Sequence, residues 1–194
     1  MPTVVAVLAL VVFVGAICFR NYQRRKVFVI HSPRFGILNL KGELANSIVS
    51  LDMEVLGPVL GQPQQSSADP PLCDVLFLYC DIGLNGDIEN YSGNLRDVIQ
   101  TSGAKVVVVA SENRGEAYIA STKAKTHGLA NLVMTIARKE AAFPKFFSRL
   151  FEDMKKGVSM PMAWVKLAPQ GPVKEHANLP EMFFVCEAGQ MVFK

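Results

Sequence analysis

The chain has 194 residues, of which 50% are hydrophobic and 19% are charged, and its formal net charge is +3. Four positive charges lie within residues 20–26 and residues 1–19 carry none, so taking those four from +3 leaves −1 for residues 27–194. This near-neutral remainder offers no basic face for nucleic acid, and its length suits one domain with its own core.

An apolar run opens the chain: residues 3–19 are TVVAVLALVVFVGAICF, and the basic segment RNYQRRK follows. As a helix, this run spans about 26 Å, which is near the lower limit for a bilayer core of about 30 Å. We therefore predict a transmembrane anchor at 1–19 and a basic juxtamembrane flank at 20–26, with lipid contacts through residues 3–26. The positive-inside rule then places the N-terminus outside or in a lumen and residues 27–194 in the cytoplasm.

Two alternatives to a retained anchor stay open. A cleaved signal peptide carries its positive charge before the apolar run and ends in a small-x-small site, and neither feature is present here. The other alternative is a helix buried in the core of the domain.

Three apolar, β-rich runs follow the basic flank: VFVIHS at 27–32, DVLFLYC at 74–80 and AKVVVVAS at 104–111. Continuous apolar runs of this length are typical of strands that are buried on both faces of a parallel sheet. Valine-rich sequence also fits a strand better than an exposed helix. We therefore expect these three segments to be strands of one sheet.

Apolar residues at helical spacing lie between and after these strands. They predict helices over 36–52, between Ile88 and Gly103, and over 129–142. The first of these helices would bury one face formed by Ile37, Leu40, Leu44, Ile48 and Leu51.

The last third of the chain is less regular. KFFSRLFEDMKK fits either a strand or an amphipathic helix, MAWVKL at 162–167 is predicted as a last strand, and LPEMFFVCEAGQMVF as a helix or an edge strand. The alternation of strands and helices predicts a parallel sheet with right-handed crossovers. The expected fold is thus α/β, a flavodoxin-like, doubly wound parallel sheet of about five strands preceded by one transmembrane helix.

The usual motifs of cofactor and metal sites are missing from the sequence. It contains no GxGxxG, no GxxxxGK[ST] and no HExxH, and its four cysteines form no CxxC pair. A phosphate-binding loop needs glycines where the backbone approaches the ligand, and a zinc site needs closely spaced ligands. We predict no cofactor and no metal.

Several residue pairs could belong to an enzyme. AYIASTKAKTHGL is similar to the Tyr-x-x-x-Lys pattern of short-chain dehydrogenases, but Tyr118 and Lys123 are five positions apart, which turns the amine away from the phenol on a helix. Glu112 and Glu116 follow a predicted strand, as does the NAD-cleaving glutamate of some TIR domains, although no motif fixes either residue. Both are expected to be solvated loop carboxylates.

His31 and Cys80 each close a predicted strand. A histidine and a cysteine at neighbouring strand ends form the nucleophilic pair of caspase-like peptidases. The stretch CDVLFLYCDIGLNG is also similar to the cysteine-bearing strand of the caspase-like CHAT peptidases. A membrane-anchored cysteine peptidase is therefore the alternative to a non-enzymatic function, beside a short-chain-dehydrogenase-like oxidoreductase.

The order of features resembles the SEFIR domain, a relative of TIR, in the cytoplasmic part of interleukin-17 receptors. RRKVFVIHSP is similar to the first strand of that family, with His31 in place of a tyrosine, and CDVLFLYCD is similar to its second strand. NLRDVIQTSGAKVVVVASENRG is similar to its helix and third strand, and GLANLVMTIARKEA with KFFSRLFED to the later helix and strand. The tryptophan that is usual before the third strand is absent, because Trp164 is the only one.

The resemblance implies a signalling domain at 27–194 that acts by homotypic association. Its partners would be SEFIR-bearing adaptors or receptors, and association of two copies would make a homo-oligomer. We expect partner contacts at charged residues on the predicted polar faces of helices, namely Arg96, Asp97, Arg138, Lys139 and Glu140.

Overall fold

The computed structural model describes residues 27–83, 86–117, 130–168 and 178–194. Its main sheet has the spatial order β3-β2-β4-β5-β6-β7. In chain order these strands are β2 (Phe35–Asn39), β3 (Gln64–Ser66), β4 (Val75–Tyr79), β5 (Val106–Val109), β6 (Asn131–Ala137) and β7 (Glu181–Cys186). Neighbouring strands are parallel except β6 and β7, which are antiparallel.

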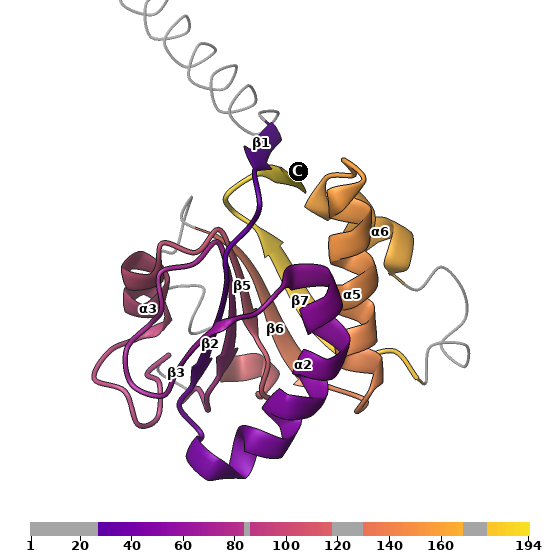
Figure 1. The fold of residues 1–194 in the computed structure, drawn as a ribbon. Helices are drawn as coiled ribbons and strands as arrows, with labels where there is room; N and C mark the ends of the chain where they lie inside the picture. Colours follow the sequence, from indigo (N-terminus) through magenta and orange to yellow (C-terminus); the bar gives the residue numbers. More distant parts are fainter. Residues whose placement is uncertain (1–26, 84–85, 118–129, 169–177) are drawn as a thin grey trace, which may run out of the picture.

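Helices cover both faces of this sheet (Figure 1). One face packs against α2 (Asn46–Leu60), α5 (Ala142–Lys155) and α6 (Met160–Leu167), and the other against α3 (Leu95–Ser102). A 3₁₀ turn, η1 (Gly42–Ala45), leads from β2 into α2. The central strands β4 and β5 are completely buried because they lie between these two helical layers.

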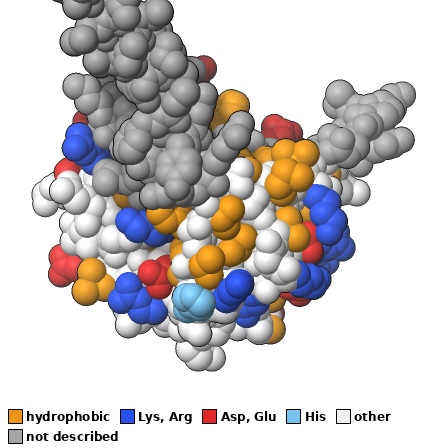
Figure 2. Space-filling model, turned by 90° about the horizontal axis from the view of Figure 1, so that it is seen from above, with side chains coloured by type: hydrophobic (Ala, Val, Ile, Leu, Met, Phe, Trp, Pro, Cys, Tyr) orange, Lys and Arg blue, Asp and Glu red, His pale blue; other side chains and the backbone are white. Residues whose placement is uncertain are grey.

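A second, two-stranded parallel sheet pairs β1 (Val27–Ile30) with β8 (Gln190–Phe193). It lies at the end of the molecule where the strands of the main sheet begin (Figure 1). Figure 2, which looks onto this end, shows a band of hydrophobic side chains bordered by lysine and arginine side chains. Val27, Phe28 and Val29 of β1 are 49%, 47% and 43% exposed.

The larger half of the core is built around aromatic rings. Phe77 of β4 meets Phe35 of β2 edge-on, with ring centroids 5.4 Å apart, and meets Phe147 of α5 at 5.5 Å. Phe151 of α5 stacks on Phe193 of β8 at 5.6 Å. These rings tie the helical layer and the small sheet to the centre of the main sheet.

Several sequence-based assignments are wrong. Residues 27–30 of the predicted first strand lie in the small sheet, and the first strand of the main sheet is β2, which overlaps the start of the predicted helix 36–52. The predicted helix 129–142 is the strand β6, and the predicted strand 162–167 is the helix α6. A short apolar run buried on all sides has no periodicity that separates a strand from a helix, which explains these errors.

The predicted fold class also needs correction. The sheet has six strands and is mixed, because β7 runs antiparallel at its edge, whereas the sequence predicts about five parallel strands. In sequence, the segment that forms β7 fits both a helix and an edge strand, since its apolar residues follow neither period clearly.

The predicted anchor at 1–19 and its flank at 20–26 lie outside the described residues. Within the described ranges, no helix is long and apolar enough to cross a bilayer. The longest of them, α2, has 15 residues and spans about 22 Å, against a bilayer core of about 30 Å. The prediction of a single-pass membrane protein with an outside N-terminus and a cytoplasmic domain is therefore corrected to an α/β domain with no membrane-spanning helix among the described residues.

Candidate functional site

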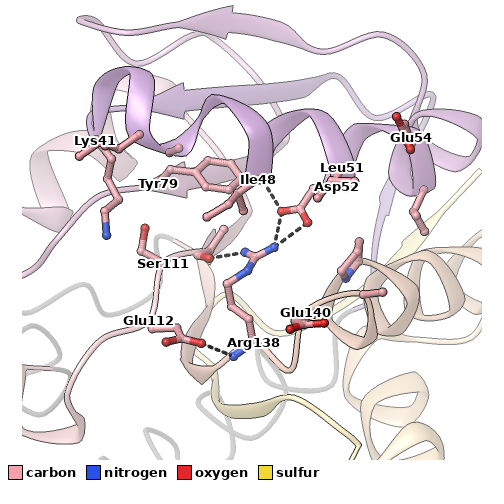
Figure 3. Close-up of a pocket in the computed structure, with 16 residues that line it drawn as sticks. Lys41, Ile48, Leu51, Asp52, Glu54, Tyr79, Ser111, Glu112, Arg138 and Glu140 are labelled. Carbon is pink, nitrogen blue, oxygen red and sulfur yellow. Dashed lines mark hydrogen bonds and ion pairs between the residues drawn. The ribbon is translucent and has the colours of Figure 1, made fainter.

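A pocket of about 840 Å³ opens at the carboxyl ends of the parallel strands. It is lined by residues one or two positions after the ends of β2, β5 and β6, namely Lys41, Ser111 and Arg138, and by Tyr79 at the end of β4. Its other wall is the face of η1 and α2 (Figure 3). A volume of this size lies within the range of about 300–1,000 Å³ that is typical of ligand sites.

The position of the pocket follows from the strand order. The five parallel strands occur in the order second, first, third, fourth and fifth, so the chain reverses its winding direction between β2 and β4. In open α/β sheets, ligands bind in the crevice outside the carboxyl ends of the strands at such a reversal. Lys41 and Tyr79 lie on the two sides of this point.

The floor of the pocket is a buried ion pair. The Nη2 atom of Arg138 lies 2.6 and 2.7 Å from the two carboxylate oxygens of Asp52, and the Tyr79 hydroxyl donates to Asp52 Oδ2 at 2.5 Å (Figure 3). Arg138 also donates to the carbonyl of Ala110, and its guanidinium lies 4.0 Å from the ring centroid of Phe143. These contacts join α2, β4, β5 and β6 beneath the opening.

Burial sets the protonation properties of this floor. Desolvation raises the pKa of Asp52, and the charge of Arg138 and the hydrogen bond from Tyr79 only partly oppose it. Desolvation and the neighbouring Asp52 carboxylate also raise the pKa of Tyr79 well above its usual value. Tyr79 is therefore neutral and acts as a hydrogen-bond donor, and the ion pair holds the pocket in one shape.

The turn between β6 and α5 supplies the opposite wall. Lys139 and Glu140 both adopt left-handed backbone conformations, with φ values of 51° and 48°. This conformation is uncommon outside glycine and tends to mark functional positions. Glu112, which follows β5, accepts a hydrogen bond from the backbone N–H of Arg138 at 3.0 Å and so fixes this turn to the end of the sheet.

The rim on the α2 side is apolar and exposed. Leu44, Ile48 and Leu51 line the pocket and are 88%, 39% and 61% exposed. Their spacing in the sequence predicts a core-facing stripe of the helix, and this prediction is wrong. The buried face of α2 carries Val49 and Leu56 instead, so the helix has apolar residues on two sides.

The structure does not bring the predicted pair His31 and Cys80 together. His31 precedes β2, while Cys80 follows β4, which is paired in parallel with β2. His31 is thus near the end of the sheet where the parallel strands begin, and Cys80 is at the end where they finish. A strand length of about 16 Å separates these two ends. Cys80 is fully buried, and burial raises the pKa of its thiol to about 12, which disfavours the reactive thiolate.

Of the candidate residues for other enzymes, only the two glutamates lie within the described residues. Tyr118 and Lys123 lie outside the described residues. Glu112 lines the pocket, whereas Glu116 is exposed beyond it. No constellation of a nucleophile and a base therefore emerges from these candidates in the part of the chain that the structure describes.

Three of the five predicted partner-binding residues lie at or beside the pocket. Arg138 is buried in its floor, which corrects the prediction of an exposed charge. Lys139 pairs with Glu181 of β7 at 3.3 Å, and Glu140 lines the pocket. The error for Arg138 has a clear source, because this residue directly follows the strand β6 and does not lie on the polar face of a helix.

The other two, Arg96 and Asp97, lie on α3 on the opposite face of the sheet (Figure 1). Asp97 belongs to a capping box: the Asn94 side chain accepts from the backbone N–H of Arg96 and Asp97, and Asp97 Oδ2 accepts from the Asn94 N–H at 2.9 Å. Asp97 is thus part of the structure that starts the helix.

Replacing Asp97 with alanine is expected to lower the free energy of unfolding by about 1 kcal/mol, because one orphan N–H at the helix start loses its acceptor. For a chain of this size that corresponds to a fall of about 2–4 °C in the midpoint of thermal unfolding. Circular dichroism would measure it, with Arg96→Ala as the control expected to leave the midpoint unchanged. Equal midpoints for the two variants would contradict the structural role of Asp97.

Sequence reasoning missed Asp52 and Ser111. Asp52 is a carboxylate one position after the apolar Leu51 in α2, and its burial depends on Arg138, which is 86 positions away. Ser111 ends the third predicted strand, and only the assembled sheet shows that it lines a pocket. A polar residue inside an apolar helical segment was the one local signal for Asp52.

No known protein-family model matches this chain, and no curated protein matches it in sequence. The fold and the site define this chain as an α/β domain with a pocket at the carboxyl ends of the parallel strands of a mixed six-stranded sheet.

Proposed function

We propose that this chain is a binding module that associates with a partner protein through the pocket at the carboxyl edge of its sheet. The observation that carries the proposal is the apolar stripe of α2, formed by Leu44, Ile48 and Leu51, which is exposed along the pocket. Exposed apolar side chains gathered at one place mark interaction sites, whereas single ones need no explanation.

The geometry of the stripe favours a peptide segment as the bound group. Leu44, Ile48 and Leu51 have the spacing i, i+4 and i+7, so they lie on one side of the η1–α2 segment over about 10 Å. Amphipathic helices bind to grooves through side chains at this same spacing. The buried Asp52–Arg138 pair beneath the stripe keeps the groove formed before a partner arrives.

The resemblance to SEFIR domains supplies one class of partner, a second domain of that kind. Homotypic association in interleukin-17-receptor-like signalling stays a prediction, and Glu140 is the predicted contact residue that lies at the open pocket. A purified SEFIR domain is accordingly one of the proteins to test for binding.

Replacing Leu51 with aspartate is expected to weaken binding of a partner segment at least tenfold. The change removes apolar contact area from the groove and adds a charge that the bound segment would desolvate. A library of displayed peptides, selected against the full chain, provides the ligands, and fluorescence anisotropy of the selected peptides measures their affinity. The same assay tests a purified SEFIR domain.

The matched control is Leu72→Asp, which changes a side chain of the same type that is 63% exposed and does not line the pocket. This variant should retain binding. Both positions are largely exposed, so both variants should fold. Equal binding by the two variants, or a selection that yields no binder, would refute the proposed function.

A further inference from the structure

The charges around the pocket are unbalanced. Its lining contains four carboxylates, from Asp52, Glu54, Glu112 and Glu140, and two cations, from Lys41 and Arg138. Asp52 and Arg138 neutralise each other, and the Lys41 ammonium already pairs with Asp81 at 2.6 Å. Glu54, Glu112 and Glu140 have no cationic partner among the described residues. The open part of the pocket therefore has a surplus of negative charge.

Two of these carboxylates lie across the pocket from the apolar stripe. Glu112 and Glu140 are on the side of the pocket opposite Ile48 and Leu51 (Figure 3). The backbone N–H of Arg138 donates a hydrogen bond to the Glu112 carboxylate and holds it in place. The left-handed turn at Glu140 fixes the backbone of that residue. The site thus has one apolar wall and one acidic wall.

A third feature points to a bound group. Ser111 lines the pocket and is only 5% exposed, and its buried Oγ has no hydrogen-bond partner among the described residues. A buried hydroxyl without a partner is unfavourable by about 1–3 kcal/mol, and most such groups in proteins are satisfied. A donor or acceptor of a ligand would remove this cost.

We infer that the partner segment is amphipathic and basic: its apolar side chains contact Leu44, Ile48 and Leu51, and an arginine or lysine lies against Glu112 and Glu140. A polar group of the same segment hydrogen-bonds Ser111 Oγ. This inference rests on the proposed function and specifies its ligand. An acidic or phosphorylated segment is disfavoured, because it would meet the unpaired carboxylates of the pocket.

A displayed library of helices tests the inference. Each helix carries a constant apolar stripe at i, i+4 and i+7, and the flanking positions vary among arginine, lysine, glutamine and glutamate. Selection against the full chain should enrich basic over acidic residues about fivefold, a preference that falls at high ionic strength. The double variant Glu112→Gln with Glu140→Gln should lose this preference, while the new amide oxygen at position 112 can still accept the hydrogen bond from the Arg138 backbone.

The matched control is Glu89→Gln with Glu152→Gln, which makes the same change in net charge at exposed positions that do not line the pocket. It should retain the preference for basic residues. If binders appear without that preference, or the preference survives in Glu112→Gln with Glu140→Gln, the inference is wrong while the proposed function stands. If no helix binds the chain better than it binds Leu51→Asp, both are wrong.

Ser111→Ala separates the hydroxyl contact from the charge contact. A selected basic peptide should bind this variant about fivefold more weakly, because its polar group loses a partner. The unfolding midpoint of the unbound variant should not fall, since the hydroxyl has no partner to lose among the described residues. Unchanged peptide affinity would remove Ser111 from the site.

Self-association of the chain that is abolished by Leu51→Asp would replace the basic partner with a second copy and overturn the inference.

Discussion

Replacing Asp52 with alanine is expected to lower the free energy of unfolding by about 3–5 kcal/mol. The variant leaves the Arg138 guanidinium buried without its carboxylate, and removing one partner of a buried ion pair has a cost of this size. An arginine cannot lose its proton to escape the penalty. Urea denaturation followed by circular dichroism would measure the change.

Two companion variants identify the cause. The double variant Asp52→Leu with Arg138→Met should be closer to wild type than Asp52→Ala, because apolar side chains replace both charges. A double variant as unstable as Asp52→Ala would contradict the ion-pair explanation and indicate a packing defect.

Arg138→Met alone should show a distinct pH dependence. Burial already raises the pKa of Asp52, and the positive charge of Arg138 is the main effect that lowers it. The Arg138→Met variant lacks this charge. The folded state of this variant then binds a proton more tightly than the unfolded state, so its stability should increase as the pH falls through the folded pKa. Asp52→Ala lacks the carboxyl group and should show no such recovery.

Replacing Phe77 with alanine is expected to destabilise the fold by about 3–5 kcal/mol. The ring is fully buried and contacts the rings of Phe35, Phe143, Phe147 and Phe151, which come from β2 and α5. The variant loses the burial of a large side chain and these edge-on ring contacts, and it leaves a cavity between the sheet and α5.

Denaturation under the same conditions would measure the loss, with Phe28→Ala as the control. Phe28 is 47% exposed on β1, so its removal should change the stability far less. A similar loss for both variants would show that the aromatic cluster is not the centre of the core.

The sequence predicts the central part of this fold well and its flanks poorly. The runs around β4 and β5 are apolar at every position, since helices cover both faces of the sheet there. Gly103, expected to end a helix, adopts the left-handed conformation at the end of α3. These features depend on neighbouring residues alone, so local patterns suffice to find them.

The errors occur where tertiary contacts override local patterns. Ile37 and Leu40 extend the helical spacing of Leu44, Ile48 and Leu51, but Ile37 pairs in the sheet between β3 and β4. The alternation in β6 is hidden because residues such as Leu132 and Val133 are buried on opposite faces. No local signal distinguishes these cases.

The candidate site was largely beyond sequence reasoning. Its floor joins Asp52 to Arg138, and its acidic wall is formed by Glu112 and Glu140, and both pairs are far apart in the chain. The sequence does make Glu112 and Glu140 candidates, but for two different functions, NAD cleavage and partner binding. Charged residues can be counted in a sequence, whereas their pairing depends on which strand ends meet.

The exposed stripe of α2 has a practical consequence for finding the natural ligand. A molecule that covers Leu44, Ile48 and Leu51 only in the folded state stabilises that state by mass action, by about 2.7 kcal/mol when its concentration is 100 times the dissociation constant. Melting-temperature screens of candidate segments against the purified chain could thus rank ligands without any assay of activity.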